Sequence, residues 1–192
     1  MNPKPEAKVL DCTAGNRKIW LIKSSPNVLW TDIEPTLEEK PDLVVDIRKT
    51  EFESKYFNMI IFDPPHYWGD TAGETFYSCT NLDNQKKFYD KYNFKRKGIP
   101  SYYGTDKYAT KKSLLGFINA AQREIYRILA DNGVLWLNWS EVKIPLEKIL
   151  PFFDQRWETM IILPIGSKKQ TLSEHQNYWI MMMKNDLKRR VN

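Results

Sequence analysis

The chain has 192 residues, and its 42% hydrophobic content is enough for one sizeable core, so we expect a single domain over residues 1–192. No run approaches the roughly 18 consecutive apolar residues of a membrane span, and the first residues lack the apolar segment of a secretory signal. We therefore expect a protein of the cytoplasm, or of the host cytoplasm if viral, without membrane contact. The net charge of +5 favours a polyanionic partner.

Cysteine and histidine are too sparse for an ordinary zinc site. The chain has two of each, Cys12, Cys79, His66 and His175, and the cysteines form no CxxC pair. We expect reduced thiols and no metal.

Short β-rich runs recur in the first third of the chain, at residues 8–10, 27–30, 43–45 and 59–62. They alternate with stretches that we interpret as helical. This alternation predicts βαβ units and a parallel sheet.

The second half of the chain continues the pattern. Apolar residues at helical spacing predict a helix over residues 113–130, ending at Asn132-Gly133, followed by a strand over 134–139. A short helix over 145–153 and strands over 157–163 and 177–183 complete the chain. Because the polar segment 166–176 joins these last two strands without a helix, we expect an antiparallel hairpin after five parallel strands, in a three-layer α/β fold.

Periodic apolar spacing stops between residues 67 and 112, which predicts a substrate-facing insertion or lid. Cations there are interleaved with aromatic rings, a combination that suits flexible or single-stranded nucleic acid. A solvated lid with its own aromatic cluster is the alternative. The candidate substrate-binding residues are Tyr67, Lys95, Arg96, Lys97, Tyr102 and Tyr103.

Acidic residues end the first three predicted strands, at Asp11, Asp32 and Asp46. Each alone fits a turn or helix cap, but three in register at the ligand-binding edge of a parallel sheet favour a nucleoside site. Asp32 is placed to accept hydrogen bonds from the ribose hydroxyls, and Asp46 is within reach of an adenine edge. The candidate cofactor-binding residues are Asp11, Cys12, Thr13, Ala14, Gly15, Asp32, Ile33, Asp46 and Ile47.

No glycine-rich loop for a pyrophosphate is present in the sequence, since it has neither G-x-G-x-x-G nor Gly-Lys-Ser/Thr. A nucleoside cofactor without phosphates is therefore expected, and S-adenosylmethionine fits.

The fourth predicted strand ends in Asp63-Pro64-Pro65-His66, which we expect to be the catalytic segment. Two prolines hold an extended, rigid turn whose carbonyl groups are free. Asp63 and the Pro64 carbonyl could accept the two N–H groups of an exocyclic amine as its nitrogen becomes positively charged. His66 or Tyr67 could stack on the base, although a buried, hydrogen-bonded imidazole is the alternative for His66.

These motifs resemble those of the class I amino-methyltransferases that act on adenine N6 or cytosine N4, with a D/N/S-P-P-aromatic motif after the fourth strand. The chain more closely resembles short, phage-type methyltransferases or DNA methylases with Asp-x-x-x-Gly-x-Arg after strand one and Asp-Pro-Pro-His after strand four. The resemblance implies a Rossmann-like, seven-stranded sheet with helices on both faces. It also implies that Asp11 and Gly15 line the methionine side of S-adenosylmethionine.

The resemblance thus implies adenine N6 of DNA as the first choice of substrate, with DNA favoured over RNA as the partner. RNA, cytosine N4 and a protein glutamine side chain remain alternatives within the enzymes. From another class, a catalytically silent, cofactor-binding partner subunit stays open. The oligomeric state is left undetermined by the sequence.

Overall fold

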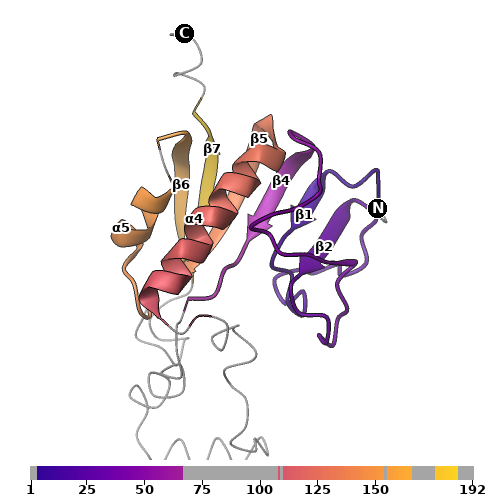
Figure 1. The fold of residues 1–192 in the computed structure, drawn as a ribbon, viewed down its shortest axis with the longest axis horizontal. Helices are drawn as coiled ribbons and strands as arrows, with labels where there is room; N and C mark the ends of the chain where they lie inside the picture. Colours follow the sequence, from indigo (N-terminus) through magenta and orange to yellow (C-terminus); the bar gives the residue numbers. More distant parts are fainter. Residues whose placement is uncertain (1–3, 67–107, 109, 154, 166–175, 186–192) are drawn as a thin grey trace, which may run out of the picture.

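A seven-stranded sheet organises the protein, with the strand order β3-β2-β1-β4-β5-β7-β6 (Figure 1). The computed structural model describes residues 4–66, 108, 110–153, 155–165 and 176–185. The strands are β1 (Val9–Asp11), β2 (Val28–Asp32), β3 (Leu43–Val44), β4 (Phe57–Phe62), β5 (Leu129–Ser140), β6 (Trp157–Ile165) and β7 (Asn177–Lys184).

The pairing directions confirm the expected sheet. The first five strands pair in parallel, and β7 runs antiparallel to both β5 and β6. Strand β1 lies between β2 and β4, so the chain order reverses there. In open parallel sheets, ligands bind beyond the carboxyl ends of the strands at such a reversal.

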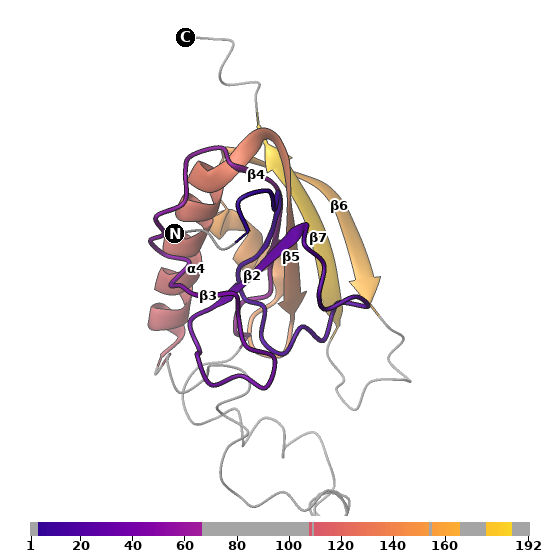
Figure 2. The same cartoon turned by 90° about the vertical axis from the view of Figure 1, so that its right-hand side faces the viewer.

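Helix α4 (Lys111–Ile128) covers one face of the sheet, as Figure 2 shows from the side. It begins with a capping box, in which Thr110 and Ser113 exchange side-chain and backbone hydrogen bonds. Its inner face includes Leu114, Ile118 and Ile125, which are fully buried as their helical spacing predicts.

The predicted end of this helix at Asn132-Gly133 is wrong, because β5 already begins at Leu129. Phe57 pairs with Leu129 but Met59 pairs with Val134, so a single residue of β4 faces four of β5 in a bulge. A Cβ at position 133 would lie 2.7 Å from Leu129 Cδ1. Close packing in the bulge, not helix termination, explains the glycine.

The remaining described helices are α5 (Leu146–Ile149) and the 3-10 helix η2 (Leu150–Phe152), which together fill most of the single helix expected over 145–153. The expected helices between the first four strands are not seen. The connections 12–27, 33–42 and 45–56 consist of turns and bends. Pro35 and Pro41 restrict the ten-residue connection 33–42, where they remove two backbone donors.

Two apolar clusters lie on opposite faces of the sheet, since successive strand residues point to opposite sides. The larger contains Leu10, Leu29 and Ile60 together with α4 and α5. The smaller contains Val28 and Trp30, packed against loop residues between β1 and β2. No described helix is long and apolar enough to cross a membrane.

Candidate functional site

The predicted cofactor loop crosses the ends of three neighbouring strands. Cys12 N donates to Ile61 O at 3.1 Å and Ala14 N donates to Thr31 O at 3.0 Å, so the segment after β1 is bonded to both β4 and β2. The Cys12 side chain is buried and also contacts Ile61 O. Burial and the neighbouring Asp11 raise the pKa of the Cys12 thiol, so it stays protonated and structural.

Asp32 holds the turn of this loop. Its Oδ2 accepts a hydrogen bond from Gly15 N at 2.9 Å, and its Oδ1 accepts one from Glu34 N at the same distance. Gly15 has φ +48°, a left-handed conformation that favours glycine, and a Cβ there would meet no atom within 4 Å. The backbone at Gly15 is therefore open to a ligand, and Asp32 lies beside it with lone pairs to spare.

Asp11 is the most buried acid of the site, with 1% exposure. Trp20 Nε1 donates to its Oδ2 at 2.6 Å, and Thr13 N donates to its Oδ1 at 3.3 Å. Burial, aided by the charges of Asp63 and Asp32, raises the pKa of Asp11 to about 7, although the bonds from Trp20 and Thr13 oppose the rise. Asp11, Asp32 and Asp63 are therefore close enough for their charges to interact, and a cation bound near them would favour the ionised form of Asp11.

Thr13 ties the cofactor loop to the predicted catalytic segment. Asp63 N donates to Thr13 Oγ1 at 2.7 Å, across 50 residues of sequence. The Asp63 side chain is 32% exposed, so its carboxylate remains accessible beside a fixed backbone. Pro64 is buried and Pro65 half-buried, as expected of a rigid turn against the sheet.

His66 is a buried and hydrogen-bonded imidazole, which was the alternative to a stacking role in the sequence analysis. It is 9% exposed, and its ring meets Trp139 edge-on with the ring centroids 5.0 Å apart. Ser140 N lies 3.4 Å from Nδ1, and Asp63 Oδ1 lies 3.3 Å from Nε2. Little of either ring face is left for stacking on a base.

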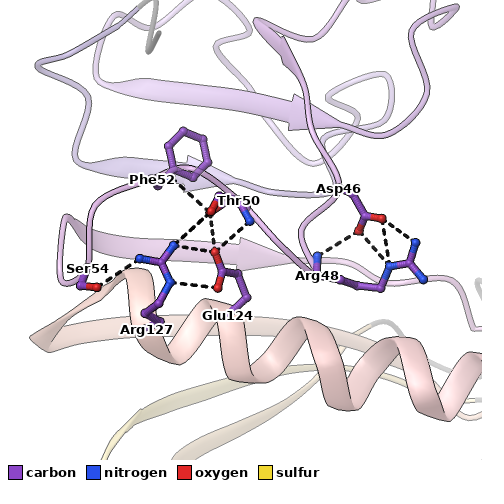
Figure 3. Close-up of polar contacts among 7 residues, drawn as sticks. All are labelled: Asp46, Arg48, Thr50, Phe52, Ser54, Glu124 and Arg127. Carbon is purple, nitrogen blue, oxygen red and sulfur yellow. Dashed lines mark hydrogen bonds and ion pairs between the residues drawn. The ribbon is translucent and has the colours of Figure 1, made fainter.

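Asp46 lies at the other end of the site, after β3, and its carboxylate is paired with Arg48 (Figure 3). The Arg48 guanidinium lies 2.5–3.0 Å from the two carboxylate oxygens. Hydrogen bonds from Arg48 lower the pKa of Asp46 despite its partial burial. Tyr108 lies close enough for both charges to affect its hydroxyl, although burial is the main cause that raises its pKa.

The two isoleucines predicted beside the cofactor differ in exposure. Ile33, after Asp32, is 43% exposed, whereas Ile47, after Asp46, is 4% exposed and belongs to the main core. Only Ile33 is therefore accessible as an apolar wall for a bound nucleoside in this conformation.

A second polar group fixes the connection after Asp46 to helix α4, as Figure 3 also shows. Glu124 Oε1 accepts hydrogen bonds from Thr50 N at 2.9 Å and from Thr50 Oγ1 at 2.6 Å. Arg127 donates to both oxygens of Glu124 and to Ser54 Oγ. This group positions the chain that enters β4, the strand that leads to the predicted catalytic segment.

Sequence reasoning placed Thr13 only against the cofactor and missed four contributors: Trp20, Arg48, Trp139 and Ser140. No motif marks them. Trp20, Trp139 and Ser140 contact residues nine or more positions away, and Arg48 acts through a side-chain ion pair with Asp46. The predicted substrate residues Tyr67, Lys95, Arg96, Lys97, Tyr102 and Tyr103 lie outside the described residues. In the described part of the chain, no three His, Cys, Asp or Glu side chains are grouped to hold a metal ion.

No protein-family model and no curated protein matches the chain in sequence. Among solved structures it is similar to a TehB-like SAM-dependent methyltransferase from Corynebacterium glutamicum, with a TM-score of 0.50 and 16% identity over 94% of this chain and 81% of that one. It is similar to N-methyltransferase NodS from Bradyrhizobium japonicum, with a TM-score of 0.51 and 9% identity over 93% and 86% of the two chains.

A third similar structure, the 4+2 cyclase SpnF, has a TM-score of 0.53 and 9% identity, covering 93% of this chain and 75% of its own. The sheet is therefore the Rossmann-like sheet of class I methyltransferases, mostly parallel with an antiparallel pair at one end. Because the same fold carries a protein named as a cyclase, the reaction has to be argued from the site.

Proposed function

We propose that this protein is an S-adenosylmethionine-dependent methyltransferase that methylates an exocyclic amine of a nucleic-acid base, with adenine N6 of DNA as the first choice. The observation that carries the proposal is the hydrogen bond from Asp63 N to Thr13 Oγ1. It joins the Asp-Pro-Pro-His segment to the loop of Gly15 and Asp32, so that one bonded unit would present both cofactor and target amine.

The residues at the loop fit S-adenosylmethionine. Asp32 would bind the ribose hydroxyls while it keeps the Gly15 turn closed, and the open backbone at Gly15 allows close approach. Asp11, buried with a pKa near 7, would accept the positive charge of the methionine end. When bound, this cofactor would supply an electrophilic methyl group on its sulfonium sulfur.

Asp63 would be the main catalytic side chain that the protein supplies. An exocyclic amine is a weak nucleophile because its lone pair is delocalised into the ring. The Asp63 carboxylate would accept one amine N–H, and the Pro64 carbonyl would accept the other, as the nitrogen gains positive charge. Acceptors already fixed by Thr13 and by the two prolines need no reorganisation, which is the source of electrostatic catalysis.

A nucleic-acid substrate is supported by the net charge of +5 and by the basic, aromatic sequence between residues 67 and 112. RNA, cytosine N4 and a protein glutamine present the same planar amine to Asp63 and remain alternatives. A silent partner subunit is disfavoured because Asp63 is accessible beside the cofactor loop.

The test is transfer of a radiolabelled methyl group by the purified protein to single- and double-stranded DNA, RNA of matched sequence and denatured protein. Digestion to nucleosides should show N6-methyladenine from DNA, and Asp63→Ala should abolish the label. Label found instead in N4-methylcytosine, in RNA or in glutamine would identify that acceptor as the substrate in place of adenine N6 of DNA. Cofactor binding without transfer to any acceptor would contradict the enzymatic proposal and favour the partner-subunit alternative.

A further inference from the structure

The imidazole of His66 lies between the end of β5 and the segment that follows β4. On one side, Ser140 N, at the end of β5, faces Nδ1 at 3.4 Å. On the other side, Nε2 faces Asp63 Oδ1 at 3.3 Å. Trp139 packs edge-on against the ring at a centroid distance of 5.0 Å, which limits its rotation. Of the polar contacts, the first is a long hydrogen bond and the second an ion-pair contact, and they approach opposite nitrogens of a buried ring.

These contacts decide which ring nitrogen carries the proton. A backbone N–H can only donate, so Nδ1 facing Ser140 must be the acceptor. A neutral imidazole has one N–H, and it must then be on Nε2, where it can donate to the Asp63 carboxylate. The main chain of β5 thereby sets the tautomer, and the tautomer sets the contact with Asp63.

The consequence falls on Asp63, whose backbone is already held by Thr13. Oδ1 lies 3.3 Å from Nε2, so a hydrogen bond from Nε2 would give the carboxylate one preferred orientation. Among the described residues, Asp63 Oδ2 accepts no hydrogen bond. That oxygen stays available to a target N–H on a side chain that is 32% exposed.

We propose that His66 is a positioning residue, which donates from Nε2 to Asp63 Oδ1 and so aims Asp63 Oδ2 at the substrate amine. This inference rests on the proposed function. It assigns His66 a role different from that of the stacking aromatic at the fourth position of the motif. The two roles make opposite demands on a substitution, because positioning needs an N–H donor whereas stacking needs a flat ring.

The experiment compares His66→Gln, which keeps an N–H donor of similar reach, with His66→Phe, which keeps a flat ring and no donor. Single-turnover methyl transfer and KM for the nucleic acid are measured for both. We expect His66→Phe to lower the rate about 10- to 100-fold, the loss of one hydrogen bond to a charged group, with KM little changed. His66→Gln should recover most of the parent rate. Near-parent transfer by His66→Phe, or a loss confined to KM, would overturn the proposal.

A double-mutant cycle separates positioning from general damage to the fold. If His66 acts through Asp63, the effect of His66→Phe should largely vanish when Asp63 is already Asn. Equal losses in both backgrounds would show that the ring acts elsewhere. Cofactor affinity serves as the folding control and should not change, since the partners of His66 among the described residues are Ser140, Asp63 and Trp139, outside the loop of Gly15.

The tautomer can also be read in the unaltered protein, which keeps the inference testable if a variant fails to fold or if no acceptor is methylated. Histidine labelled with ¹⁵N distinguishes a protonated Nε2 from a protonated Nδ1 in NMR spectra. The signals of His66 are assigned by their loss in His66→Gln, because the chain has one other histidine. We expect the proton on Nε2 at neutral pH. A proton on Nδ1, or the averaged signal of a free ring, would refute the positioning role whatever the substrate proves to be.

Discussion

The two ends of the site differ in how their acids are held. At one end Asp11 is 1% exposed, and burial raises its pKa to about 7. At the other end the Asp46 side chain is 33% exposed, and hydrogen bonds from Arg48 lower its pKa. Asp11 ends β1 and Asp46 follows β3, in the parallel part of one sheet, and both were predicted by the same rule. The difference comes from what packs over them.

Under the proposed function, the buried end would serve the chemistry and the exposed end would serve recognition. Around Asp11 and Asp63 the contacts come from backbone amides and from Trp20, Thr13 and His66. Around Asp46 the partner is an arginine two residues away whose side chain is exposed to solvent. Substitutions should therefore have large effects at the first end and small effects at the second.

The largest effect is expected for Asp63→Asn, which keeps the shape of the side chain and removes the charge that stabilises the developing cation. Single-turnover transfer should fall roughly 10²- to 10³-fold, while cofactor affinity changes little. Rapid-quench kinetics beside a cofactor titration would measure both. Transfer at the parent rate would reduce the Asp-Pro-Pro-His segment to a structural strand stop.

A smaller loss is expected for Asp32→Ala, which removes the proposed ribose acceptor and the partner of Gly15 N. Cofactor affinity should weaken at least about 10-fold, since a hydrogen bond to a charged group contributes roughly 1.5–3 kcal/mol. Titration calorimetry would measure it. The matched control is Asp42→Ala, because Asp42 also accepts a backbone bond, from Trp30 N, but lies outside the loop. Equal losses in both variants would argue against a ribose contact.

Opposite pH dependence is expected at the two ends when each acid is replaced by its amide. Because the pKa of Asp11 is raised on folding, its protonated form stabilises the fold below about pH 4 and this contribution is lost as pH rises towards 7. In the parent, the free energy of unfolding should decline by up to about 1.4 kcal/mol for each pH unit in that range, and Asp11→Asn should remove this decline. Urea unfolding at pH 5 and pH 8 would measure this, and the stability of the variant relative to the parent should be higher at pH 8 than at pH 5.

For Asp46 the pH dependence has the opposite sign. Its pKa is lowered on folding, so its ionised form stabilises the fold at pH values above the ordinary aspartate pKa, and this benefit is lost as pH falls below about 4. Asp46→Asn should therefore be slightly less stable than the parent at neutral pH, with the gap closing in acid. The same sign of pH dependence in both variants would contradict the contrast between the two ends.

The smallest effect is expected for Arg48→Ala, which frees the Asp46 carboxylate for an adenine amine. Because exposed ion pairs contribute at most about 1 kcal/mol, cofactor binding should tighten by no more than about fivefold. Arg48→Lys, which keeps the charge without the planar fork, is the control and should lie between. Weaker binding in Arg48→Ala would indicate that Arg48 itself contacts the cofactor.

The sequence alone determined the sheet and the line of acids along its edge. The short β-rich runs were recognisable because their residues favour strands, and a helix-free polar connection indicated the terminal hairpin. Asp11, Asp32 and Asp63 could be predicted together because strand ends meet at one edge of a parallel sheet. Such signals are local, and each can be read within a few residues.

Tertiary structure decided what surrounds those acids. The tautomer of His66 depends on a backbone N–H that is 74 residues away, and the backbone of Asp63 depends on a hydroxyl 50 residues away. The glycine after Asn132 serves a bulge rather than a helix end because β5 pairs with β4 from Leu129 onward. In each case the same local residue type suits two environments, and only long-range packing, which sets burial and hydrogen-bond partners, selects one of them.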